Sequence, residues 1–312
     1  MIKLDAATVL LQWAVGGLFF LWITSRGRLL GIGYGWLMRT VYAVIAAGGV
    51  AVAVYATGVV AVREVAALGV VVAAVVALVV SILRRKAGVS GQRAELERKK
   101  QRVAAMTGAG RSADPSATLD RSATLEMRDE FGRIRPEIPK SLGDASLAEF
   151  PPYLDLIAPL IGCIGLVAGG WDAGGNHALA IARTVVGAAF LGVVSDAMLL
   201  GHWYLVQPGL PRSPIHELNH WIMRLWPFEV GLLLVPTGMV SAVRGTIDDG
   251  WNGLLSWFWV GSAVMTIVLS IVTKAALKER AYSAVMAATG LLYLAILTGF
   301  CTDLVARAIL AP

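Results

Sequence analysis

Continuous apolar runs of about 20 residues recur along this chain, and they constrain its fold more than any other feature. Residues 65–82, for example, read VAALGVVVAAVVALVVSI without a single charge. The hydrocarbon core of a bilayer is about 30 Å thick, and a helix needs about 20 residues to cross it. Strands of a membrane barrel would instead alternate apolar and polar residues over about ten positions. The sequence lacks that alternation, so it predicts an all-α, polytopic bundle of transmembrane helices.

Composition and charge exclude several other classes of protein. Hydrophobic residues make up 57% of the 312 positions and charged residues only 15%, against about 25% charged residues in soluble domains. The net charge of +6 comes from basic residues beside apolar runs, which indicates membrane topology and lipid contact, with no nucleic-acid partner. Cys163 and Cys301 lie inside apolar runs without metal-site or disulfide spacing, so we expect small buried hydrophobes there.

Apolar windows predict about eight spans. Spans two and three are separated only by Arg63 and Glu64, so the sequence leaves open whether they are separate helices. We divide the chain into a three-span part (1–83), a soluble segment (84–150) and a five-span part (151–312). The predicted spans are 6–24, 41–62, 65–83, 154–170, 180–206, 221–241, 254–273 and 282–305.

Lysines and arginines between the spans predict the orientation. Fourteen of them lie between Arg84 and Lys140, and further groups lie between spans one and two and before span eight. With eight spans these three loops share one side, which the positive-inside rule makes cytoplasmic. We therefore expect a multi-pass protein of a bacterial inner membrane with both termini outside. Arg39 is expected near the membrane surface, where its long side chain reaches water.

Residues 84–150 form the one long soluble segment. Positions 91–105 are rich in helix formers and predict a cytoplasmic extension of the third span. From Gly108 to Phe150 the chain is rich in Gly, Ser, Pro and charge and has too few apolar residues for a core. We expect this segment to be disordered alone and to dock a protein partner.

Ionisable residues inside spans are costly in hydrocarbon, and here they gather in spans five and six. These spans are antiparallel neighbours, so Asp196 and Glu229 are expected at similar depth, with His202 and His216 nearer the cytoplasm. Together they predict a cytoplasm-facing pocket for a quinone or a haem b. The same carboxyl groups could relay a proton or cation, or simply hydrogen-bond to neighbouring helices. Asp303 and Arg307, four residues apart in span eight, are expected to form a local ion pair.

The sequence HELNH, from His216 to His220, matches the HExxH pattern of zinc hydrolases. Two histidines one helical turn apart can bind zinc, and the glutamate can act as general base. His202 is the candidate third ligand and Glu217 the candidate base. No NPDG-like segment supplies the aspartate ligand that intramembrane zinc proteases use.

A resemblance to known proteins lies in two stretches, LGHWYLVQPGLPRSP (200–214) and RAYSAVMAATGLLYLAILTGF (280–300). They are similar to uncharacterised multi-pass membrane proteins of high-GC bacteria, which implies a membrane fold but no activity. Our leading hypothesis is an accessory subunit of a respiratory or other energy-converting complex that is not an enzyme by itself. The alternatives are a membrane zinc hydrolase and a transporter or proton relay.

Overall fold

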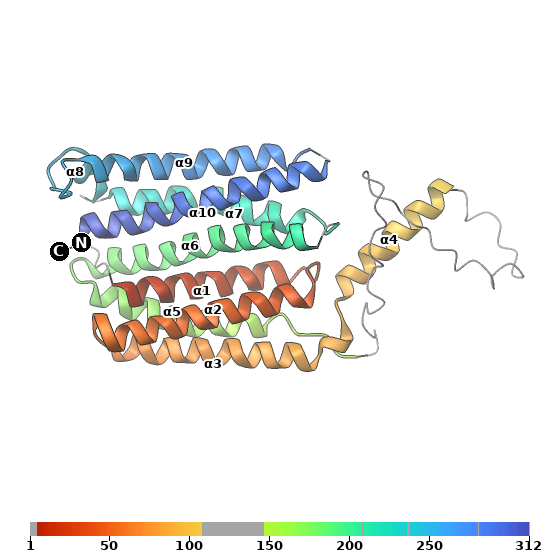
Figure 1. The fold of residues 1–312 in the computed structure, drawn as a ribbon. Coiled ribbons are helices and arrows are strands. Elements are labelled where there is room, and N and C mark those ends of the chain that lie inside the picture. The colour runs from red at the N-terminus through yellow and green to blue at the C-terminus, as the bar shows by residue number, and fades with distance from the viewer. Residues whose placement is uncertain (1–4, 108–146, 208, 236–237, 280, 312) are drawn as a thin grey trace, which may run out of the picture.

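The computed structural model describes residues 5–107, 147–207, 209–235, 238–279 and 281–311. Long helices run roughly parallel and antiparallel to one another in a bundle, as Figure 1 shows. A short 3-10 turn (Arg85–Ala87) precedes α4, which projects from one end of the bundle. The helices are α1 (Ala6–Ser25), α2 (Ile32–Val52, continued by a π-helical turn, Ala53–Thr57), α3 (Ala61–Leu83), α4 (Ser90–Thr107), α5 (Leu154–Asp172), α6 (His177–Val206), α7 (Ser213–Leu234), α8 (Met239–Val243), α9 (Leu254–Ala276) and α10 (Tyr282–Leu310).

The fold confirms the predicted all-α membrane bundle. Among the described residues, seven helices are long and apolar enough to cross a bilayer: α1, α2, α3, α5, α6, α9 and α10. The more polar α7 is not among them, although it packs in the bundle against α6 and α9. The start of α1 and the end of α10 lie at one end of the bundle, which we call the terminal end, and α4 projects from the other, the loop end (Figure 1).

Spans two and three are separate helices. The chain turns between them at Gly58, whose φ of +96° suits a residue without a side chain. The position of Arg63 and Glu64 between the two predicted spans suggested that they form this turn. They lie instead in the first turns of α3 and are buried. Burial is possible because both are paired there, which sequence spacing alone did not reveal.

The predicted sixth span, 221–241, corresponds to α7, which begins eight residues earlier. It starts at Ser213 with Pro214 in its first turn, where the missing N–H of proline removes no intrahelical hydrogen bond. It ends before Val235, whose ψ of 147° is extended, as expected for a residue that precedes proline. The Arg183 guanidinium of α6 donates to the carbonyl oxygens of Leu232 and Val235, both at 2.8 Å, and so satisfies a helix end inside the bundle.

Helix α1 is the most buried of the membrane-length helices, and it packs on α6 through glycine. A Cβ atom added at Gly16 would overlap the Ala188 carbonyl oxygen, and one added at Gly192 would overlap the Gly16 backbone. Small residues allow such backbone contact in membranes, where dispersion forces rather than the hydrophobic effect drive helix packing. This glycine contact therefore fixes the distance between the two central helices.

The glycine contact can be tested with the substitutions Gly16→Ala and Gly48→Ala. Alanine favours a helix over glycine by about 1 kcal/mol, and Gly48 has open space where its Cβ would lie, so Gly48→Ala should be neutral or stabilising. Gly16→Ala should instead destabilise by about 1–3 kcal/mol, the usual range for overpacking. Thermal unfolding in mild detergent measures both, and equal midpoints for the two variants would refute the contact.

Candidate functional site

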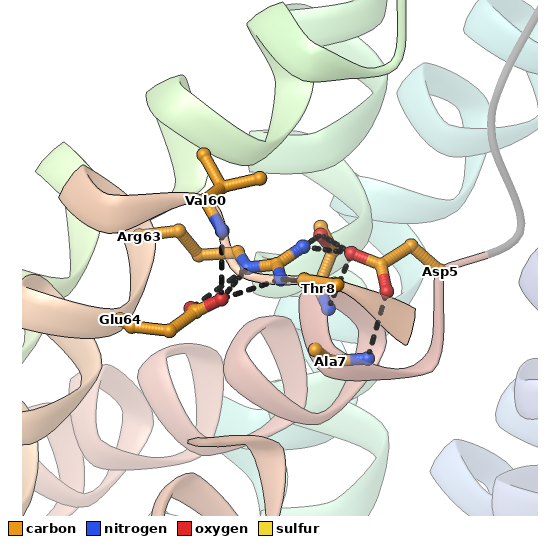
Figure 2. Close-up of polar contacts among 7 residues, drawn as sticks. Asp5, Ala7, Thr8, Val60, Arg63 and Glu64 are labelled. Atoms are coloured by element: carbon orange, nitrogen blue, oxygen red, sulfur yellow. Dashed lines mark hydrogen bonds and ion pairs between the residues drawn. The ribbon is translucent and has the colours of Figure 1, made fainter. Parts of the chain in front are cut away.

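The first buried charge cluster joins α1 to α3 at the terminal end (Figure 2). Arg63, only 1% exposed, donates to the carboxyl groups of Asp5 and Glu64, to the Thr8 hydroxyl and to the Gly58 carbonyl oxygen. All five N–H groups of a guanidinium can find acceptors in this arrangement. A cluster this fully paired is structural: it clamps the start of α3 to the start of α1.

A second pair clamps the loop end. Arg39 of α2 binds Asp155 of α5 through two parallel hydrogen bonds, Nε to Oδ1 at 2.7 Å and Nη2 to Oδ2 at 2.8 Å. The guanidinium also lies 4.2 Å from the centre of the Phe150 ring. The expectation that Arg39 reaches water near the membrane surface is thus wrong, because its side chain is only 3% exposed. A bidentate partner 116 positions away in the sequence makes this burial possible.

A third cluster joins α6, α7 and α10 in the terminal half. Arg307 Nε donates to Asp303 Oδ2 at 2.8 Å, which confirms the predicted ion pair, and both side chains are buried. Glu229 interacts electrostatically with Asp303, Arg307 and Arg183. Two carboxyl groups and two guanidinium groups therefore influence one another electrostatically in this region, although Glu229 Oε1, Asp303 Oδ1 and Arg307 Nη2 have no hydrogen-bond partner among the described residues.

Asp196, unlike Asp5, Glu64, Asp155 and Asp303, forms no ion pair among the described residues. It is fully buried in α6, and the Tyr42 hydroxyl of α2 donates to its Oδ1. Its Oδ2 has no hydrogen-bond partner among the described residues, and no Lys, Arg or His of that part of the chain forms an ion pair with it. A carboxylate in hydrocarbon without a cation is very costly, so this site calls for a bound proton or cation.

The predicted pairing of Asp196 with Glu229 does not form. Asp196 lies ten positions from the end of α6, whereas Glu229 lies sixteen positions from the start of α7. Six residues at helical rise separate their depths by about 9 Å. The prediction measured the depth of Glu229 from the turn that holds His216 and His220; counted from the helix start at Ser213, Glu229 lies deeper than Asp196, toward Asp303.

The predicted histidine sites do not assemble either. His202 is exposed on α6, with Nδ1 3.0 Å from the Tyr293 hydroxyl of α10. His220 is exposed and His216 partly buried, and Glu217 pairs with Arg26 at 2.5 Å. The described residues contain no group of three His, Cys, Asp or Glu side chains placed to hold a metal ion. The predicted zinc ligands are therefore not assembled in the described residues, and the exposed His202 does not share the buried environment of Asp196.

The sequence reasoning missed Tyr42, the partner of Asp196. A tyrosine eleven residues into an apolar helix is a usable signal, because a buried phenol hydroxyl needs a hydrogen-bond partner. Only the tertiary structure shows that the partner is Asp196, which lies 154 positions further along the chain.

Comparisons with protein-family models, with curated proteins and with solved structures find no match for this chain. No relative therefore supplies a ligand or an activity for Asp196. Its chemistry must be inferred from its surroundings: complete burial, one tyrosine hydroxyl and one carboxyl oxygen without a partner.

The Arg63 clamp can be tested with Arg63→Met, which keeps most of the side-chain volume and removes the charge. The change leaves Asp5 and Glu64 buried without their cation, and breaking such a pair costs about 3–5 kcal/mol. The exposed Arg224, stacked 5.6 Å from the Trp221 ring centre, provides the matched control, Arg224→Met. Unfolding midpoints in detergent should fall strongly for the first variant and little for the second. Similar midpoints would contradict the clamp.

Proposed function

We propose that this protein is a membrane-embedded proton relay whose proton is held at Asp196. One observation carries the proposal: Asp196 is a fully buried carboxyl group without a cation, next to a tyrosine hydroxyl. Asp5, Glu64, Asp155 and Asp303 form ion pairs with arginine, and Glu229 interacts electrostatically with Arg183 and Arg307. Acids inside membrane spans commonly mark proton pathways, since a proton is the smallest cation that neutralises them.

The relay would serve an energy-converting complex of a bacterial inner membrane. Helix α4 supports an assembly role, because it projects from the bundle (Figure 1) and its sequence, SGQRAELERKKQRVAAMT, is polar around most of its circumference. A polar helix without an apolar face to bury often bridges to another protein. We propose α4 and the segment after it as the partner-binding part; positions 108–146 of that segment lie outside the described residues.

The charges at the loop end support a cytoplasmic location for that end. Arg26, Arg28, Arg84 and Arg85 lie there, beside the α1–α2 turn and the end of α3. Lysine and arginine concentrate on the cytoplasmic side of membrane proteins. In the proposed orientation, both termini face the outside and α4 faces the cytoplasm.

The proposal is tested with purified protein in liposomes that enclose a pH-sensitive dye. A potassium gradient with valinomycin drives proton movement, which the dye reports. Asp196→Asn keeps the shape of the side chain and removes the titratable proton, so it should reduce flux about 100-fold, the usual scale for a positioned proton-transfer group. Tyr42→Phe should give a smaller loss, because it removes only the hydrogen bond to Oδ1.

Asp248→Asn is the matched control, since Asp248 lies in the exposed segment between α8 and α9, and its flux should equal that of the unmodified protein. Infrared spectroscopy adds a second readout: the band of a protonated carboxyl group should vanish in Asp196→Asn and remain in Asp248→Asn. Unmodified protein that moves no protons above empty liposomes and lacks that band would overturn the proposal.

A further inference from the structure

We infer that Gly17 of α1 positions the Tyr42 hydroxyl on Asp196, and that this contact makes Oδ2 the carboxyl oxygen that carries the exchanged proton. The inference rests on the proposed relay and names a positioning residue for it. Gly17 has no side chain and cannot touch the proton, so it acts only through the place that it leaves for Tyr42.

Two consecutive glycines, Gly16 and Gly17, lie buried in the middle of α1. Glycine weakens a helix because its backbone loses the most freedom on folding, so a buried glycine pair indicates close approaches that a side chain would block. Each glycine has one. A Cβ atom added at Gly16 would overlap the α6 backbone, whereas one added at Gly17 would overlap three ring atoms of Tyr42. Neighbouring residues point about 100° apart around a helix, which lets the two glycines receive different helices.

Gly17 lets a side chain of α2 reach α6. Helix α1 packs against both of these helices and lies between them in Figure 1. Tyr42 belongs to α2 and Asp196 to α6, yet the Tyr42 hydroxyl donates to Asp196 Oδ1. The tyrosine ring therefore crosses α1 at the point where glycine leaves the backbone bare. Both side chains are fully buried, so their hydrogen bond does not compete with bulk water.

Helix α2 is held on either side of Tyr42. Three residues earlier, Arg39 forms two hydrogen bonds with the buried Asp155, and residues three apart lie on the same side of a helix. Seven residues later, a Cβ atom added at Gly49 would lie only 3.3 Å from a backbone oxygen of α1. Since α2 cannot turn or withdraw without losing these contacts, the position of the Tyr42 ring depends on the bare backbone at Gly17.

The hydrogen bond from Tyr42 distinguishes the two oxygens of Asp196. A protonated carboxyl group has one carbonyl oxygen, which accepts hydrogen bonds, and one hydroxyl oxygen, which carries the proton. Tyr42 donates to Oδ1, and Oδ2 has no partner among the described residues, so the proton belongs on Oδ2. When that proton leaves, the bond to Oδ1 becomes charge-assisted and stronger. Tyr42 thus stabilises the carboxylate and keeps its own proton.

Thermal unfolding in mild detergent tests the placement of the ring without relying on proton flux. Gly17→Ala should lower the midpoint by about 2 °C or more, because the new methyl group displaces the Tyr42 ring. In a Tyr42→Ala background the ring is gone, and Gly17→Ala should then be neutral or stabilising, since alanine is the better helix former. Gly48→Ala, with open space at its Cβ, should behave alike in both backgrounds.

Folding of the double variant where Gly17→Ala alone does not fold would also support the placement. A loss on Gly17→Ala that is the same with and without the Tyr42 ring would overturn it.

Infrared spectroscopy separates positioning from a purely structural role. The carboxyl band that vanishes in Asp196→Asn should move to higher wavenumber in Tyr42→Phe, because its carbonyl oxygen loses a hydrogen-bond donor. Gly17→Ala should move the band in the same direction, and Gly17→Ala with Tyr42→Phe should move it no further than Tyr42→Phe alone. Gly48→Ala should leave it in place. A band that stays in place in Tyr42→Phe would overturn the assignment of the proton to Oδ2, and one that stays in place in Gly17→Ala would overturn the positioning role.

Liposome flux gives the functional readout. Tyr42→Phe and Gly17→Ala should each lower flux about tenfold, the change equivalent to losing one hydrogen bond to a charged group. Because both remove the same contact, the double variant should also lose about tenfold, not the product of the two losses; a loss equal to that product would mean that Gly17 does not act through Tyr42. Absence of both flux and the carboxyl band in the unmodified protein would sink the relay, while the unfolding experiment still decides whether Gly17 places Tyr42.

Discussion

A charged side chain inside a bilayer needs an oppositely charged partner, and this requirement determines which helices of the bundle pack together. Helices α1 and α3 meet where Arg63 bridges two carboxyl groups, and α2 meets α5 where Arg39 holds Asp155. These clamps lie near opposite ends of the three-helix N-terminal part and its neighbour α5. Because either partner alone would be buried without compensation, each clamp favours one arrangement of helices over its alternatives.

Asp196 gains its significance from the same constraint. Four other buried acids, toward the ends of the bundle, pair with arginine, whereas this carboxyl group has only a tyrosine hydroxyl. A proton can neutralise it and can also leave, which a fixed arginine cannot do. The close backbone contact of Gly16 with Ala188 and Gly192 packs α1 against α6 on the side of Asp196 that faces the terminal end.

The sequence predicted the elements of the fold better than the site. Apolar runs located the membrane helices because the length of a span is set by bilayer thickness. The same reasoning misread Arg63 and Glu64 as an interruption and Arg39 as a surface residue, since a lone charge in an apolar window looks like a boundary until its partner is known. Glu229 was assigned to Asp196 because its depth was estimated from the His216 turn instead of from the start of α7 at Ser213.

From the sequence by itself follow the helical class, the approximate limits of the helices and the presence of acids within them. All of these depend on local composition and on the cost of exposing a backbone to hydrocarbon. The tertiary structure alone decided which charges on different helices meet and which buried carboxyl group has no arginine partner. Those contacts join residues more than 50 positions apart, such as Asp5 with Arg63 and Tyr42 with Asp196, and distances of that kind are set by helix packing, which no local pattern encodes.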